Sequence, residues 1–196
     1  MDVQEKPKGK LRTGFTTGTS ATAASMAAIL SIINQKKIES VDVLLPKKDR
    51  IKININSCKF DKNKARCSVI KDGGDDPDVT HGAEIVVDLE LTSKPNSIEI
   101  DGGEGVGRVT KPGIGLEIGQ AAINPIPRKM ITENLTLTGK KILEKNGIKV
   151  VISVPKGKEL GPKTDNPRIG IVDGISILGT SGIVIPYSTA SFAAAI

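Results

Sequence analysis

The sequence predicts an α+β protein with a mixed β-sheet packed against a few helices. Strand-like segments rich in β-branched residues gather in the first half of the chain, and they do not alternate strictly with helices as in a parallel α/β fold. Aromatic residues make up only 2% of the 196 residues, and tryptophan is absent. We therefore expect a core built from Ile, Val, Leu and Ala.

Each element follows from local signals. Thr and Ser at positions 16–20 can cap an Ala-rich helix that runs to about residue 34. After a glycine-rich loop, helical segments are expected at 116–124 and 128–147, with Gly147 as the stop. Residues 157–164 are expected to form a surface turn. Apolar and alternating patterns predict strands at 41–45, 51–56, 65–70, 83–91, 97–100, 148–155 and, with a turn, 168–178.

The chain is expected to hold one α+β domain over residues 11–196, preceded by a disordered polar tail at residues 1–10. Its longest weakly polar run, residues 21–33, is shorter than the roughly 20 apolar residues that span a bilayer. The amino terminus lacks the apolar stretch of a signal peptide. These features favour a cytoplasmic protein that does not bind membranes.

The net charge of +6 favours an anionic partner. Nucleic acid is disfavoured because Phe15, Phe60, Tyr187 and Phe192 are scattered and form no stacking platform. A small polyanion fits better. Two cysteines and a single histidine cannot supply the four ligands of a structural zinc site, so we expect no zinc site, and we assign no residue as a metal ligand.

The segment GFTTGTSATAA (14–24) places glycines and hydroxyl residues before a helix. A helix amino terminus can bind a carboxylate or phosphate, and ordinary capping is the alternative. No lysine follows Gly18 as a P-loop would require. The candidate binding residues here are Thr16, Thr17, Thr19 and Ser20.

The segment SIEIDGGEGVGRVTKPG (97–113) has the D-x-G-x-G-x-G spacing of nucleotide-binding loops. A standard Rossmann assignment fails because Pro112–Gly113 forms a turn where the helix should open. The glycines still indicate close approach of the backbone to a ligand or to another strand. Arg108 and Lys111 could pair with anions. A second small-residue loop lies at 174–184. The candidate binding residues of the two loops are Gly103, Glu104, Gly105, Gly107, Arg108, Lys111, Thr180 and Ser181.

The segment DGGDDPDVTHG (72–82) holds four aspartates and the only histidine of the chain. An acidic turn, a Mg²⁺ or Ca²⁺ site and an acid–base site are all compatible with it, although EF-hand spacing is absent. Carboxylates near a histidine can orient it for proton transfer. Asp72, Asp75, Asp76 and His81 are the catalytic candidates. We expect this loop to lie beside loop 14–20, where glycine-rich loops would form one ligand cleft.

The segments LRTGFTTGTSATAA, VIKDGGDDPDVTHGAEI, IDGGEGVGRVTKPGIG, AAINPIPRKMI and KTDNPRIGIVDGISILGTSGIV resemble, in this order, signature segments of the CbiD family. These proteins are the cobalt-precorrin-5B C(1)-methyltransferases of anaerobic cobalamin biosynthesis. The resemblance runs from about Leu11 to about Ser188. Ser20 stands where we expect a cysteine in the family, so a thiol cannot be essential there.

The resemblance implies methyl transfer from S-adenosylmethionine to ring carbon C1 of cobalt-precorrin-5B, giving cobalt-precorrin-6A, with cobalt present only in the substrate. The aspartate loop could hold the positive methyl donor or manage a proton on the macrocycle. Candidates for contacts with the carboxylates of this anionic tetrapyrrole are Arg12, Arg108, Lys111, Arg128 and Lys129. Asn124 is a further candidate for binding the substrate or the cofactor.

Family members continue beyond the region that this chain resembles. The alternative is therefore a truncated, non-catalytic tetrapyrrole-binding or assembly module. A phosphate-binding enzyme is a third reading, which the lack of a P-loop disfavours. A homo-oligomer is among the assemblies that we expect.

Overall fold

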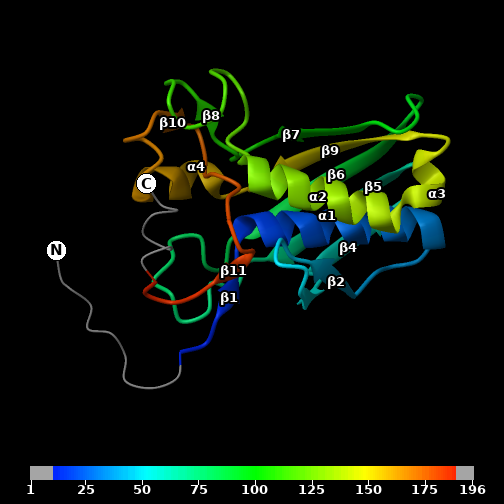
Figure 1. Ribbon diagram of the computed structural model, residues 1–196, viewed down its shortest axis with the longest axis horizontal. Helices are drawn as coiled ribbons and strands as arrows, with labels where there is room; N and C mark the ends of the chain where they lie inside the picture. Colours follow the sequence, from blue (N-terminus) through cyan, green and yellow to red (C-terminus); the bar gives the residue numbers. More distant parts are fainter. Residues whose placement is uncertain (1–10, 189–196) are drawn as a thin grey trace.

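The computed structural model describes residues 11–188, so the tail expected at residues 1–10 lies outside the described residues (Figure 1). The structure confirms an α+β fold with a mixed sheet and few helices. Its helices are α1 (Thr17–Asn34), α2 (Pro125–Thr138), α3 (Lys140–Leu143), α4 (Gly157–Leu160) and the 3₁₀ turn Gly161–Lys163. Its strands are β1 (Gly14–Phe15), β2 (Ser40–Leu44), β3 (Arg50–Asn54), β4 (Ser57–Phe60), β5 (Lys64–Ile70), β6 (Glu84–Thr92), β7 (Ile98–Gly102), β8 (Arg108–Val109), β9 (Gly147–Ser153), β10 (Ile171–Val172) and β11 (Ile183–Val184).

The main sheet has five strands in the order β4-β5-β6-β9-β7. All neighbours are antiparallel except β7 and β9, which run parallel. A single parallel pair confirms that this is not a Rossmann sheet. Strand β4 was not predicted, because it spans only four residues and two of them are polar. It is fixed by its pairing with β5, in which Cys58 lies opposite Cys67.

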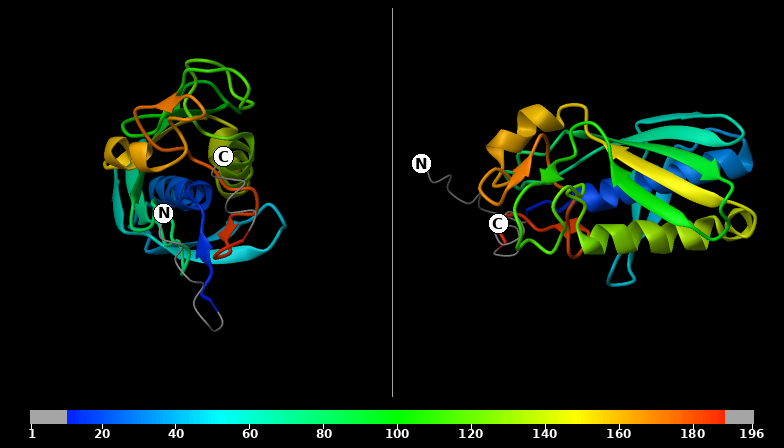
Figure 2. Two further views of the ribbon diagram at one scale, coloured as in Figure 1. Left: turned by 90° about the vertical axis from the view of Figure 1, so that its left-hand side faces the viewer. Right: turned by 90° about the horizontal axis from the view of Figure 1, so that it is seen from above.

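Helix α1 packs on the inner face of this sheet, and the β2–β3 hairpin and α2 contact it as well. Seen end-on in Figure 2, α1 occupies the middle of the molecule. All but three of its 18 residues are buried. Its small side chains allow close packing, and hydroxyl groups along it bond to the carbonyl one turn earlier, as Thr22 does to Gly18 and Ser25 to Ala21.

The helix predicted over 116–124 is wrong. Gly119 adopts a positive φ of 89° within this range, and Gly115 just before it has a φ of 74°; a helix cannot accommodate such values. Ala121 and Ile123 are extended and form bridges to Arg108 and Ile177. Pairing with distant segments overrides the local helical composition.

The later helices also differ in their limits from the prediction. The helix predicted over 128–147 begins earlier, at Pro125, because Asn124 and Pro125 supply an N-cap position and a favoured first residue. It ends at Thr138, with Gly139 at the C-cap position, and α3 is a separate short turn. The surface turn predicted at 157–164 instead forms α4 and a 3₁₀ turn, and only Ile171–Val172 of 168–178 is strand.

The short elements β1, β8, β10, β11 and α4 gather at one end of the molecule, on the left in Figure 1. The loops singled out by their sequence meet at this end. Helix α1 begins here as well, so its amino terminus faces the gathered loops. Within residues 11–188, none of the helices combines the length and apolar character needed to cross a membrane.

Candidate functional site

The aspartate loop and the segment before α1 lie side by side, as predicted. The backbone N–H of Asp75 donates to the carbonyl of Arg12 (3.0 Å), and the N–H of Phe15 donates to the carbonyl of Asp72 (2.8 Å). The Asp75 carboxylate accepts from the N–H of Arg12 at 2.6 Å. Whether the two segments share a ligand stays a prediction.

Glycine is required where these two segments cross. A Cβ atom on Gly14 would lie 2.2 Å from the carbonyl carbon of Gly73. A Cβ atom on Gly74 would lie 2.3 Å from the carbonyl oxygen of Arg12, and its φ is +67°. These glycines therefore serve the contact between the two backbone segments.

Asp72 and Arg12 form an ion pair in which both guanidinium Nη atoms donate to the carboxylate. This hydrogen bonding from Arg12 outweighs desolvation and lowers the pKa of Asp72, with help from the N–H of Gly74. Both side chains are more than a third exposed, so the pair adds little stability. Its exposure leaves it accessible to a ligand.

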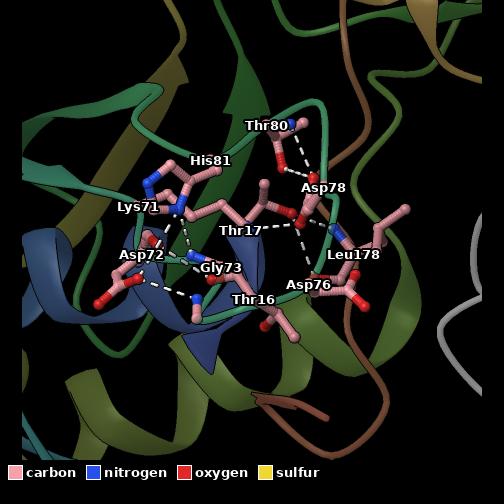
Figure 3. A network of polar contacts seen from close by, with 12 residues as sticks. Thr16, Thr17, Lys71, Asp72, Gly73, Asp76, Asp78, Thr80, His81 and Leu178 are labelled. Carbon is pink, nitrogen blue, oxygen red and sulfur yellow. Dashed lines mark hydrogen bonds and ion pairs between the residues drawn. The ribbon is translucent and has the colours of Figure 1, made fainter. Parts of the chain in front are cut away.

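His81 lies beside Asp72 (Figure 3). Its Nδ1 atom accepts a hydrogen bond from the N–H of Gly73 at 3.1 Å and lies 3.7 Å from Asp72 Oδ1. The ring is half exposed. The orientation of His81 is therefore set by the glycine backbone, with the carboxylate nearby.

Lys71 is a residue that sequence reasoning missed. It is 2% exposed, and its ammonium group pairs with Asp78 beneath the loop (Figure 3). Burial alone would raise the pKa of Asp78, but the charge and hydrogen bond of Lys71, with the two donors of Thr80, lower it. The available signal was a lysine directly after an apolar strand and seven residues before an aspartate.

The other aspartates also have separate donors. Asp76 accepts from the backbone N–H of Tyr187 at 2.8 Å, which ties the segment after β11 to the loop. Asp75 accepts from Arg12. Each of Asp75, Asp76 and Asp78 therefore faces its own N–H or ammonium donor.

The hydroxyl residues at the start of α1 are buried and bonded within the chain. Thr16 caps the helix by accepting from the N–H of Thr19, and Thr19 donates to the carbonyl of Gly182. Thr17 bonds to Leu178, and Ser20 donates to the carbonyl of Thr16. Segment 178–182 thus covers the helix start and supplies hydrogen-bond partners for the hydroxyl groups of Thr17 and Thr19. Within this segment, Thr180 is exposed and Ser181 is partly exposed.

The glycine-rich loop packs against the chain's own backbone. A Cβ atom on Gly105 would lie 1.9 Å from the carbonyl oxygen of Val154, and one on Gly157 would lie 1.9 Å from the carbonyl oxygen of Gly105. A Cβ atom on Gly107 would meet Ile171, and one on Gly103 would meet Ser153. Of the two alternatives for these glycines, close approach to another segment is the one observed.

The charged side chains around this loop are more exposed to solvent than its glycines. Glu104 and Lys111 are exposed, and the aliphatic part of Lys111 lies against Gly170. Arg108 pairs with Asp101, and Arg128 is half buried against strand β7. Asn124 occupies the N-cap position of α2 without a side-chain capping bond, and Lys129 is exposed on the same helix.

The candidate residues therefore form two groups at one end of the fold. One contains Arg12, Asp72, Asp75, Asp76 and His81; the other surrounds Arg108 and Arg128. Segment 174–182 joins them, because Gly174 packs on Gly105 and Leu178 bonds to Thr17. A hollow of about 510 Å³ lies elsewhere, on the outer face of the sheet between Lys59, Arg66, Asp88 and Lys149.

Across residues 11–188, no three His, Cys, Asp or Glu side chains are grouped so that they could hold a metal ion. The cysteines, Cys58 and Cys67, are buried, and burial is the main cause that raises the pKa of the Cys67 thiol. A buried thiol with a raised pKa is a weak nucleophile and a weak metal ligand.

A mixed sheet covered by α1, with glycine-rich loops and paired charges at one end, defines an α+β protein outside the Rossmann class. The CbiD family model matches residues 3–186. The chain belongs to the CbiD family, as its signature segments predicted.

Curated relatives support this assignment. The cobalt-precorrin-5B C(1)-methyltransferase of Geobacillus kaustophilus is 50% identical over 189 residues, covering 96% of this chain and 50% of the relative. The protein of the same name from Picrophilus torridus is 49% identical over 185 residues, covering 94% of this chain and 54% of the relative. The chain thus spans about half the length of the curated relatives it matches.

A solved structure shares the fold. The crystal structure of the cobalamin biosynthesis protein CbiD from Archaeoglobus fulgidus matches with a TM-score of 0.69 and 34% identity. The match covers 95% of this chain and 59% of the other. The fold seen here is therefore the fold of one part of a CbiD protein.

Proposed function

We propose that this chain takes part in S-adenosylmethionine-dependent methylation of cobalt-precorrin-5B at C1, giving cobalt-precorrin-6A. The observation that carries the proposal is the 50% identity, over nearly the whole chain, to relatives named for this reaction. The surplus of basic residues supports it, because the substrate is an anionic tetrapyrrole ringed with carboxylates.

The reaction asks for little covalent chemistry from the protein. The electron-rich ring carbon supplies the electron pair for the new carbon–carbon bond, and the bond between sulfur and methyl breaks to leave S-adenosylhomocysteine. Catalysis then consists mainly of holding the two reactants in line and excluding water. Cobalt enters only as part of the substrate.

The two groups of residues fit different parts of this task. Asp72, Asp75 and Asp76 carry negative charge suited to a sulfonium donor, and Asp72 and Asp75 are accessible. His81 and Asp72 could manage a proton on the macrocycle. Arg12, Arg108, Lys111, Arg128 and Lys129 offer positive charge to carboxylates. We also propose a cytoplasmic location and no partnership with nucleic acid.

A second candidate function is a tetrapyrrole-binding or assembly module without activity of its own. The observation that favours it is the coverage, since the chain matches only about half of each relative's length. A donor site shared with the other half would leave this chain unable to transfer the methyl group.

Transfer of labelled methyl from S-adenosylmethionine to cobalt-precorrin-5B tests the proposal. The Geobacillus kaustophilus relative serves as the full-length comparison. Label in the corrin product with this chain alone supports catalysis. Precorrin binding without transfer, while the relative transfers, supports the binding module. Tight ATP binding with no precorrin binding would instead support a phosphate-binding enzyme.

A further inference from the structure

Asp101 lies beside two arginine side chains at the carboxyl end of β7. Arg108 donates through Nη1 to Asp101 Oδ1 at 3.0 Å and through Nη2 to the carbonyl of Gly102. Arg128 donates through Nε to the carbonyl of Ile123 at 3.0 Å and through Nη1 to the carbonyl of Ile100 at 2.7 Å. Both guanidinium groups are thus fixed by backbone carbonyls next to one carboxylate.

The charges around Asp101 do not balance. Asp101 is the one carboxylate that forms an ion pair with either arginine in the part of the chain that the structure describes, so a positive charge is left over. Burial is the main cause that lowers the pKa of Arg128, and nearby Asp101 opposes it. Burial alone would raise the pKa of Asp101. The N–H of Gly102 and the two arginines outweigh this effect, so the pKa of Asp101 is lowered overall.

The contact between Asp101 and Arg108 is easily replaced. Arg108 uses a single carboxylate oxygen, and that oxygen also accepts from the N–H of Gly102. The Asp101 side chain is 59% exposed and that of Arg108 is 40% exposed. Exposed ion pairs of this kind contribute little free energy, whereas a ligand carboxylate can bind an arginine through two oxygens.

We propose that Asp101 is an internal stand-in for a ligand carboxylate: it occupies Arg108 in the free protein and is displaced when an acetate or propionate group of the tetrapyrrole binds between Arg108 and Arg128. The inference rests on the proposed function for the identity of the ligand. It makes Asp101 a residue that limits affinity, because binding must first break its contact with Arg108. Removing its charge therefore strengthens binding of polycarboxylates.

The same sheet offers a matched control. Arg66 and Asp88 form an ion pair between neighbouring strands β5 and β6, at 2.6 Å, with side chains 55% and 43% exposed. Their net charge and exposure resemble those of the Arg108–Asp101 pair. They lie away from the glycine-rich loop, beside the hollow on the outer face of the sheet, so changes there report the effect of charge outside the proposed site.

The test measures binding of metal-free uroporphyrin, a fluorescent tetrapyrrole with eight carboxylates, to the whole chain. Asp101→Asn keeps the oxygen that accepts from Gly102, and it is expected to tighten binding about threefold to fivefold, the size of a broken surface ion pair. Asp88→Asn is expected to change binding less than about twofold. Equal effects of the two variants, or weaker binding by Asp101→Asn, would overturn the proposal.

Arg108→Gln provides the opposite change, because it removes the positive charge while keeping a polar side chain. It is expected to weaken binding about tenfold, while Arg66→Gln has little effect. Thermal unfolding of all four variants checks that they fold. Failure of the unmodified chain to bind uroporphyrin would also overturn the inference.

Failure of the proposed function gives a different result. If the chain binds uroporphyrin with the expected pattern of variants but transfers no methyl group, the stand-in role holds and methyl transfer by this chain is excluded. If methyl transfer occurs while Asp101→Asn and Asp88→Asn behave alike, the proposed function holds and the stand-in role is wrong.

Discussion

The Nδ1 atom of His81 accepts a hydrogen bond from the backbone N–H of Gly73, with 3.1 Å between the two nitrogen atoms. An acceptor nitrogen carries no proton, so the neutral ring bears its proton on Nε2. The half-exposed ring therefore presents a hydrogen-bond donor to the solvent side. In this form His81 can donate a hydrogen bond through Nε2 but cannot accept a proton there.

This tautomer can be measured directly, because His81 is the only histidine. In ¹⁵N NMR at a pH where the ring is neutral, Nδ1 is expected in the unprotonated, pyridine-like region and Nε2 in the protonated, pyrrole-like region. His81→Asn places an amide oxygen near the Nδ1 position, so it is expected to retain the bond from Gly73 while losing the outward donor. The reverse assignment of the two nitrogens would contradict the observed contact.

The buried pair of Lys71 and Asp78 is expected to stabilise the aspartate loop. Asp78→Ala leaves a buried ammonium without its partner, so it should reduce the free energy of unfolding by about 3–5 kcal/mol. The double variant Lys71→Met with Asp78→Ala should recover much of this loss. Urea unfolding measures both. Equal stability of the single and double variants would show that the charge of Lys71 is not the cause.

The same pair predicts a pH dependence. The pKa of Asp78 is lowered in the folded chain, so its contribution is present above the unfolded value of about 4 and is lost as the pH falls through the folded value. Unfolding free energies should therefore fall below about pH 4 in the wild-type chain, and less steeply in Asp78→Asn. Asp88→Asn, which removes an exposed pair, should leave this slope nearly unchanged.

Gly105 is expected to tolerate no side chain. Gly105→Ala places Cβ 1.9 Å from the carbonyl oxygen of Val154 at a φ of +69°, and it should cost more than about 3 kcal/mol. Gly82→Ala shares the positive φ, +74°, but has no atom within 4 Å of the new Cβ, so it should cost about 1–2 kcal/mol. Similar losses in thermal and urea unfolding would show that backbone conformation, not packing, requires Gly105.

Asp75 allows donor recognition to be separated from stability. Asp75→Asn keeps an oxygen that can accept from the N–H of Arg12, so its melting temperature should change little. If its charge holds the sulfonium, binding of S-adenosylmethionine should weaken about tenfold while binding of neutral-sulfur S-adenosylhomocysteine stays the same. Asp49→Asn, in the turn between β2 and β3, is the control. Equal loss for both ligands would assign Asp75 a structural role.

The sequence by itself determined the features that depend on local pattern. Thr16 and the Ala-rich run that follows specify α1, because capping and helical propensity are properties of adjacent residues. The apolar runs specify β5, β6 and β9 for the same reason. The five signature segments identified the family, since long motifs in order carry far more information than a single glycine loop.

Only the tertiary structure decided what depends on distant partners. Residues 116–124 form no helix because Gly119 takes a positive φ and Ala121 and Ile123 form bridges to Arg108 and Ile177, which no local propensity reports. Lys71 appeared as an ordinary charged residue until folding buried it against Asp78. Likewise, the sequence left open whether Gly105 approaches a ligand or another strand, and folding places its backbone against Val154 and Gly157. Contacts between distant segments decide which side chains are buried and which hydrogen-bond donors each carboxylate meets. Charge and spacing along the sequence alone could not predict either.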